Sequence, residues 1–232
     1  MENDFSYVGE NLERIRDNVR EACAKAGRSE DSVRIMAVTK TVAPEIVNCA
    51  IEQGIDLLGE NRVQEFLSKK DSYLKSAEVH MIGTLQTNKV KYIINDVSMI
   101  QSVDSEKLLG EISRLAVKNG RTMEILCEVN IGGEDSKSGI APGEVRGLLE
   151  KAAHTEGVRL RGLMTIPPPS DSDIFLGRMG ELFSKLKDNN SYGMNMDILS
   201  MGMTHDYADA VKYGSTLVRI GSGLFGARNY SK

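Results

Sequence analysis

The sequence predicts an α/β fold, a single (β/α)8 TIM barrel with an extra N-terminal helix. Short apolar, β-branched stretches alternate with amphipathic stretches of helical period along the whole chain. Alternating strands and helices imply a parallel sheet. Eight such units in 232 residues match a closed barrel, with a doubly wound open sheet as the alternative. Because no linker or fixed-period repeat interrupts the pattern, residues 1–232 are interpreted as one domain.

Helices are expected where apolar residues recur every three or four positions. Phe5 to Ala26 forms the leading helix, and Gly27 follows as a stop signal. Pro44 fits the first turn of the next helix, and Asp104 or Ser105 would cap a later one. The expected helices cover residues 5–26, 45–53, 63–74, 86–94, 105–118, 142–155, 174–187 and 204–213.

Strands are expected in the short apolar runs between these helices. Pro167, Pro168 and Pro169 would force an extended end to the sixth of them. Every expected strand except the last is followed by a helical stretch. The expected strands cover residues 33–39, 55–59, 79–82, 97–103, 123–130, 158–166, 196–200 and 216–220.

Lys40 ends the first strand and is the residue around which we organise the interpretation. Side chains alternate along a strand, so Lys40 shares a face with Met36 and Val38. At the rim of an apolar interior, desolvation would lower the pKa of its ammonium group. The resulting amine could form a Schiff base with an aldehyde. On this stretch alone, a strand that ends at a solvated lysine is the simpler interpretation.

Polar and glycine-rich segments follow the ends of the expected strands. In a parallel barrel these loops lie on one face, where active sites are found. Polar loops are common in any barrel, but amides, glycines and hydroxyls together favour a binding site. The segments are residues 59–62, which include Asn61, and residues 83–89, 130–139, 165–169, 200–206 and 221–223.

The loops after the seventh and eighth strands predict a site for one phosphate group. Barrels often bind phosphate between these two loops. Thr204 is expected to cap a helix whose free N–H groups favour an anion, and glycine lets the backbone approach a ligand. Alternatively, Thr204 is only a cap and the glycines only form turns. The candidate residues are Ser200, Gly202, Met203, Thr204, Gly221 and Ser222.

Arg219 lies inside the apolar strand formed by residues 217–220. A buried arginine needs a partner, so it forms either a structural ion pair or a ligand contact. Facing a pyridine nitrogen, it could only donate a hydrogen bond, which would weaken the ring as an electron sink. Gly221 to Gly226 also matches G-x-G-x-x-G, but too little chain follows for a dinucleotide-binding βαβ unit.

The composition excludes several classes of protein. The net charge of -4 without a basic block argues against nucleic-acid binding. No secretory signal or membrane-spanning apolar run is present, so no membrane association is expected. The three cysteines, Cys23, Cys49 and Cys127, are widely spaced and fit a reduced cytoplasm. No metal-ligand spacing is found among histidines, cysteines and carboxylates.

Several motifs in order carry a family resemblance across essentially the whole chain. Together they resemble the pyridoxal phosphate homeostasis protein family, also called the YggS/PROSC family. The motifs are Ala37-Val38-Thr39-Lys40, Gly59-Glu60-Asn61-Arg62, the segment from His80 to Lys89, Leu199-Ser200-Met201-Gly202-Met203-Thr204, and the segment from Val218 to Arg228.

The resemblance implies a barrel related to the N-terminal domain of alanine racemase. It implies pyridoxal 5'-phosphate (PLP) bound as a Schiff base on Lys40, with Asn61 lining the cofactor and Arg219 beside the ring nitrogen. Phosphate contacts map to Ser200, Thr204, Gly221, Ser222 and nearby backbone. Family members have no established turnover and are thought to buffer or deliver the cofactor, which would make PLP-dependent apo-enzymes their partners. We expect a monomer rather than a dimer.

Two enzymatic alternatives remain open. In a PLP-dependent amino-acid racemase, Lys40 would serve one face of the substrate. The racemases that this chain resembles take the opposite group from a second domain and a partner subunit. In a Schiff-base aldolase without PLP, Lys40 would react with a phosphorylated sugar directly.

Overall fold

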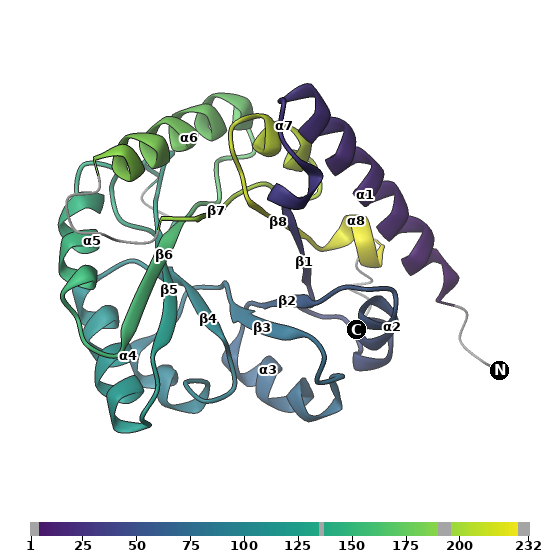
Figure 1. Ribbon diagram of the computed structural model, residues 1–232. Coiled ribbons are helices and arrows are strands. Elements are labelled where there is room, and N and C mark those ends of the chain that lie inside the picture. Colours follow the sequence, from purple (N-terminus) through teal and green to yellow (C-terminus); the bar gives the residue numbers. More distant parts are fainter. Residues whose placement is uncertain (1–4, 135–136, 190–195, 227–232) are drawn as a thin grey trace.

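The computed structural model describes residues 5–134, 137–189 and 196–226, in which eight parallel strands close into a barrel surrounded by helices (Figure 1). Strand order follows the chain, and the first strand pairs with the last. The predicted TIM barrel is confirmed, and the open sheet is wrong. The strands are β1 (Arg34–Val38), β2 (Leu57–Glu60), β3 (Glu78–Met81), β4 (Met99–Val103), β5 (Met123–Glu128), β6 (Val158–Met164), β7 (Ile198–Ser200) and β8 (Leu217–Ile220).

The helices lie outside the barrel and largely match the expected ranges. Pro44 begins the second helix as predicted, and Ser105 caps the fourth by accepting a hydrogen bond from the backbone N–H of Leu108. The α-helices are α1 (Ser6–Lys25), α2 (Pro44–Glu52), α3 (Val63–Lys69), α4 (Glu106–Lys118), α5 (Val145–Ala153), α6 (Ser172–Asp188), α7 (Tyr207–Lys212) and α8 (Ser222–Phe225).

Three expectations about helices need correction. Residues 87–92 form the 3-10 helix η3 (Thr87–Tyr92) and not an α-helix. The helix expected at Thr204 starts at Tyr207 with Asp206 at its N-cap, so Thr204 is not a cap. The eighth strand is followed by a helix after all, the short α8. Two further 3-10 helices are η1 (Glu30–Ser32) and η2 (Lys70–Ser72).

The barrel interior is apolar in its middle and polar toward the ends where the strands terminate. Met36, Leu57 and Leu217 belong to one interior cluster, while Met99, Leu126 and Met164 form another. Alternation then places the inward-facing Gln101, Ser200 and Arg219 nearer the carboxyl ends of their strands. The opposite rim is closed by ion pairs, including Arg34 with Asp56 and Glu78, and Arg161 with Glu124 and Asp197.

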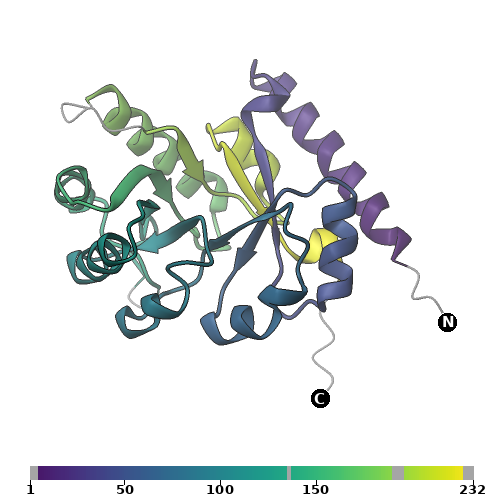
Figure 2. The same ribbon diagram turned by 60° about the horizontal axis from the view of Figure 1, so that its bottom comes forward.

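Helix α1 packs beside α7 and α8, which follow the last two strands (Figures 1 and 2). The side-chain amide of Asn11 donates to the carbonyl of Leu224 at 2.9 Å, and Asn18 donates to the Tyr207 hydroxyl at 2.8 Å. The predicted extra helix therefore supports the part of the barrel where the phosphate site is expected.

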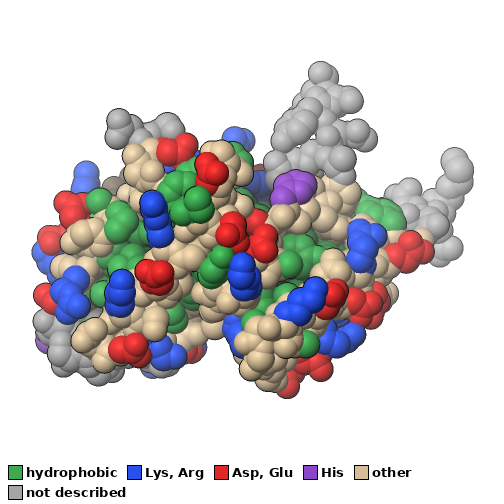
Figure 3. Space-filling view, turned by 90° about the horizontal axis from the view of Figure 1, so that it is seen from above, with side chains coloured by type: hydrophobic (Ala, Val, Ile, Leu, Met, Phe, Trp, Pro, Cys, Tyr) green, Lys and Arg blue, Asp and Glu red, His purple; other side chains and the backbone are tan. Residues whose placement is uncertain are grey.

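The surface carries charges of both signs. On the face shown in Figure 3, acidic and basic side chains are interspersed and do not gather into one basic patch. Within the described ranges, no helix has the length and apolar character needed to span a bilayer. The same ranges contain no group of three or more His, Cys, Asp or Glu side chains placed to hold a metal ion.

Candidate functional site

A pocket of about 190 Å³ opens at the carboxyl ends of the strands. It brings together side chains from loops that are far apart in the sequence. Its charged and titratable lining side chains, Lys40, Arg219 and His205, are basic, which favours an anionic ligand. The lining residues are Val38, Lys40, Asn61, Ile82, Ile166, Met203, Thr204, His205, Arg219, Gly221 and Ser222.

Lys40 lies half-buried at the pocket wall, directly after β1. Val38 precedes it on the same face and is part of the interior apolar cluster, as strand alternation predicts. The amine is therefore held where an apolar interior meets a polar opening. This is the arrangement in which a lysine can act as a nucleophile toward a carbonyl carbon.

The backbone around Lys40 is held by groups behind the pocket. Thr41 has a φ of 64°, a left-handed conformation that a β-branched residue rarely adopts. Its backbone N–H donates to the Glu65 carboxylate, while the Lys69 ammonium pairs with Glu65 and donates to the Thr39 carbonyl. Burial opposes ionisation of Glu65, but these donors outweigh it and lower the pKa of the carboxyl group. Helix α3 thus fixes the segment that carries the amine.

A second carboxylate lies behind β1 and β2. The buried Glu60 accepts hydrogen bonds from the Thr39 hydroxyl at 2.7 Å and from the Tyr73 hydroxyl at 2.6 Å. Burial raises the pKa of Glu60, although both hydrogen bonds and the Lys69 charge oppose this shift. Glu60 therefore joins the ends of the two strands that deliver Lys40 and Asn61.

Asn61 contributes an amide to the pocket from the end of β2. Its Oδ1 atom is buried and has no hydrogen-bond partner among the described residues. A buried acceptor without a donor is costly, and such atoms occur at ligand sites. Gly83 allows this arrangement, because a Cβ at that position would lie 2.2 Å from the Asn61 carbonyl oxygen.

Arg219 forms the wall of the pocket nearest the barrel interior. Its Nη1 donates to the Ser200 hydroxyl and its Nη2 to the Thr165 carbonyl, both at 2.7 Å. Burial lowers the pKa of Arg219 to about 10, and the negative charge of Glu128 opposes this shift. The guanidinium is therefore still protonated at neutral pH and acts only as a hydrogen-bond donor.

Two hydroxyl groups approach each other between the loops after β7 and β8. The Thr204 and Ser222 hydroxyl oxygens are 3.5 Å apart, and the Gly223 N–H donates to the Thr204 hydroxyl at 3.2 Å. Gly223 permits this approach, since a Cβ there would lie 2.9 Å from the Thr204 methyl carbon. Hydroxyl and backbone donors at this position suit the oxygen atoms of a phosphate group.

The remaining candidate residues take different positions. Ser200 is fully buried and does not line the pocket. Gly202, at a φ of 92°, packs against α7 and its carbonyl accepts the Arg219 N–H at 3.0 Å. Met203 lines the pocket, but its N–H already donates to the Asp206 carboxylate at 2.6 Å. Residues 135–136 of the expected polar loop, and Ala227 and Arg228 of the last motif, lie outside the described residues.

Sequence reasoning missed several residues around the site. Ile82 and Ile166 line the pocket with apolar surface. Both lie in segments that the sequence marks, 80–89 and 165–169, but neither is among the candidate site residues. Gln101 is not among the candidate residues, yet its side-chain amide contacts both His80 and Ser200. The signal available for Gln101 was a long polar side chain inside a largely apolar strand, the same kind of signal that singled out Arg219.

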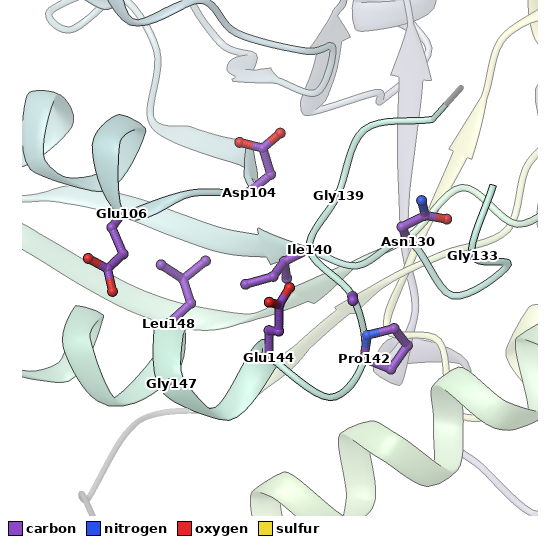
Figure 4. A pocket seen from close by; sticks show the side chains of 11 residues that line it. Asp104, Glu106, Asn130, Gly133, Gly139, Ile140, Pro142, Glu144, Gly147 and Leu148 are labelled. Carbon is purple, nitrogen blue, oxygen red and sulfur yellow. The ribbon is translucent and has the colours of Figure 1, made fainter. Parts of the chain in front are cut away.

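A larger pocket of about 650 Å³ lies between α4, α5 and the loop after β5 (Figure 4). The charged side chains among its described lining residues are Asp104, Glu106 and Glu144, all acidic. These negative carboxylates repel a negatively charged phosphate group, so this pocket is unsuited to a phosphorylated ligand. The smaller, basic pocket is the better candidate despite its size.

Comparisons with known proteins identify the family of this chain. Residues 11–229 match the family described as alanine racemase, N-terminal domain. A protein of Aquifex aeolicus named pyridoxal phosphate homeostasis protein is 41% identical over 227 residues, which cover 95% of this chain and 98% of the relative.

Two solved structures share the whole architecture. A protein from Bifidobacterium adolescentis is 33% identical, with a TM-score of 0.90 and 97% of each chain covered. PipY of Synechococcus elongatus, solved with PLP bound, is 28% identical, with a TM-score of 0.83 and coverage of 94% of this chain and 100% of PipY.

Proposed function

This chain belongs to the pyridoxal phosphate homeostasis protein family, and from that membership we propose that it binds PLP in the pocket at the end of β1. One observation carries the proposal: a single small pocket joins the Lys40 amine, the Arg219 guanidinium and the hydroxyl groups of Thr204 and Ser222. PipY, which the chain matches over its whole length, has been solved with PLP bound. We also propose that residues 1–232 act as one ligand-binding domain.

The residues present fit the groups of this cofactor. PLP supplies an aldehyde, a pyridine ring and a phosphate when it is bound. Lys40 would hold the aldehyde as a Schiff base, and Thr204, Ser222 and the backbone at Gly221 would hold the phosphate. The buried Oδ1 of Asn61 would accept a hydrogen bond from the ligand, which would satisfy an otherwise unpaired acceptor.

We propose that the protein holds the cofactor without turning over a substrate. Arg219 lines the pocket as a permanent donor, so a ring nitrogen beside it would stay unprotonated. An unprotonated pyridine is a poor electron sink for carbanion chemistry. The chain's own residues therefore bind and orient the cofactor but do not favour catalysis.

The cellular role follows from retention without turnover. We propose that the protein buffers PLP in the cytoplasm, delivers it to PLP-dependent apo-enzymes, and so influences amino-acid and keto-acid pools. The three free cysteines, Cys23, Cys49 and Cys127, support a reducing location. We propose that it acts as a monomer.

The covalent attachment is tested by reduction of the purified, PLP-loaded protein with borohydride. The expected result is the mass of the reduced ligand on the peptide that contains Lys40. Lys40→Ala should lose the yellow colour, while Lys118→Ala on the exposed end of α4 should keep it. A colourless protein that PLP cannot reconstitute would instead support the aldolase.

Turnover and delivery need separate assays. We expect no exchange of the α-hydrogen of alanine and other amino acids with solvent. Sustained exchange that disappears in Lys40→Ala would establish a racemase instead. Delivery predicts that the loaded protein reactivates a PLP-dependent apo-enzyme faster than an equal concentration of free PLP does, and an equal or slower rate would contradict it.

A further inference from the structure

We propose that Ser200 and Gln101 are positioning residues that fix the guanidinium of Arg219 at the pocket wall through a hydrogen-bonded chain anchored on His80. The proposal assigns Ser200 a role toward Arg219 in place of a phosphate contact. It rests on the proposed function only where it concerns ligand affinity, because the hydrogen-bonded chain consists of protein side chains and does not involve the ligand.

The chain crosses the barrel interior from β8 to β3. Arg219 donates from Nη1 to the Ser200 hydroxyl, and that hydroxyl donates to Gln101 Oε1, both at 2.7 Å. The Gln101 amide nitrogen lies 2.9 Å from His80 Nδ1. The exposed fractions of Gln101, Ser200, His80 and Arg219 are 0%, 0%, 3% and 3%, so water does not compete for these contacts.

Each contact fixes the direction of the next. Arginine has no acceptor, so the Ser200 oxygen must accept from it and use its own proton elsewhere. That proton goes to Gln101 Oε1, which leaves the amide N–H groups to face His80. His80 Nδ1 must then be an acceptor, with the ring proton on Nε2, 3.7 Å from the Glu78 carboxylate. Donors therefore point the same way along the whole chain, from Arg219 to His80.

This direction argues against a phosphate contact by Ser200. A serine hydroxyl has one proton to donate, and here Gln101 takes it. Phosphate oxygens accept hydrogen bonds, so a contact would require Ser200 to abandon Gln101. Thr204 and Ser222, which line the pocket, do not face this conflict.

The fixed geometry limits where Arg219 can point. Its second terminal nitrogen donates to the Thr165 carbonyl, so Nη1 and Nη2 are both held from below the pocket. A planar guanidinium anchored at two corners cannot rotate without breaking a buried hydrogen bond. Removing the Ser200 hydroxyl frees one corner and leaves a buried donor unpaired.

The test compares PLP with pyridoxal, which lacks the phosphate group. If Ser200 acts through Arg219, Ser200→Ala weakens both ligands by a similar factor, about fivefold to tenfold. Gln101→Met changes a residue that does not line the pocket and hydrogen-bonds to Ser200 and His80, and it should weaken the binding of both ligands. In an Arg219→Met background, which has no donor for the Ser200 hydroxyl, Ser200→Ala should lower affinity by less than about a further twofold, because its hydrogen-bond partner has been removed. Thermal melting of each variant confirms that it is folded.

Two affinity results would overturn the proposal. Loss of PLP affinity with unchanged pyridoxal affinity would make Ser200 a phosphate ligand. Unchanged affinity for both ligands in Ser200→Ala would remove any positioning role.

A measurement on ligand-free protein separates this inference from the proposed function. In 15N-labelled protein, the His80 ring should carry its proton on Nε2 and not on Nδ1, and Gln101→Met should shift the Nδ1 resonance. A proton on Nδ1 in the unsubstituted protein would contradict the direction of the chain. If the protein binds neither PLP nor pyridoxal, the proposed function fails while this measurement still tests the chain.

Discussion

At the residue scale, the pocket separates side chains that face the ligand from side chains that hold them. Lys40, Asn61, Thr204 and Ser222 line one cavity, as their positions after strands led us to expect, and Arg219 joins them from within β8. Ser200 lies one layer deeper. Sequence alone could not place it, because a serine at a strand end can turn its hydroxyl toward the loop or toward the barrel interior. That choice depends on Gln101, a residue 99 positions away.

Replacing Thr204 by valine tests the phosphate contact directly. The substitution keeps the shape of the side chain and removes the hydroxyl that lies between Ser222 and the Gly223 N–H. We expect PLP affinity to fall about tenfold and pyridoxal affinity to stay within about twofold. Equilibrium dialysis of both ligands measures this. Thr122→Val, at an exposed position before β5, is the control and should change neither affinity.

Replacing Asn61 by leucine should move stability and binding in opposite directions. The buried Oδ1 has no partner among the described residues, so its removal should raise the free energy of unfolding of the ligand-free protein by about 1 kcal/mol. PLP retention should fall, because the ligand loses an acceptor. Asn48→Leu is the contrasting control: its amide bonds the Ser72 carbonyl and the Leu74 N–H, so that substitution should destabilise. Destabilisation of ligand-free protein by Asn61→Leu would contradict the argument.

At the element scale, the periodic pattern predicted strands and long helices well but not the short helices. Residues 86–94 have apolar positions at helical spacing, yet the connection between β3 and β4 forms the 3-10 helix η3. Propensity cannot distinguish the two when a connection is this short. Helix α7 begins three residues after Thr204, with Asp206 at the N-cap position, and the Asp206 carboxylate accepts the Met203 N–H in the turn before the helix. Helix α8 has four residues, too few for a period to be visible.

Helix α3 has a function that its sequence does not reveal, namely to hold the loop after β1. Glu65→Gln should loosen this loop, because the carboxylate pairs with Lys69 and accepts the N–H of Thr41 in its left-handed conformation. We expect stability to fall by about 1 to 2 kcal/mol, as for a charged hydrogen bond that is largely shielded from water. We also expect Schiff-base formation with added PLP to slow severalfold, as followed by the absorbance of the bound chromophore.

The control for this prediction is Glu45→Gln, which changes an exposed carboxylate in the first turn of α2. It should alter stability by less than about 0.5 kcal/mol. If Glu65→Gln loses stability but forms the Schiff base at the original rate, α3 supports the fold and has no influence on Lys40.

At the scale of the whole molecule, the barrel separates two polar ends with an apolar middle. The binding end carries the basic pocket, while the opposite rim carries ion pairs of Arg34 and Arg161. The fold class followed from the sequence because the alternation of strands and helices is a property of the entire chain. The hydrogen-bonded chain through the interior could not be predicted in this way. It joins four strands, and the sequence does not specify their register.

The same interior chain makes stability depend on pH in a predictable direction. Burial lowers the pKa of His80 below its ordinary value of 6.5, although the Glu78 carboxylate opposes the shift, with weaker effects of Arg34 and Glu124. Just below pH 6.5, His80 is therefore protonated in the unfolded chain but remains neutral in the folded protein. Stability from the neutral ring is present above pH 6.5 and is lost as the pH falls toward the lower folded pKa.

Comparison with His80→Gln isolates this contribution from other groups that titrate nearby. Burial raises the pKa of Glu60 and of Glu128, so these carboxyl groups act in the opposite direction, but they are present in both proteins. Denaturant unfolding between pH 5 and 7 should show the original protein losing stability faster than the variant as pH falls. The difference in slope should be at most about 1.4 kcal/mol per pH unit, the value for one proton. If stability depends on pH equally in the two proteins, His80 accepts a proton without breaking its contact with Gln101. The proposed direction of the hydrogen bonds from Arg219 to His80 would then be wrong.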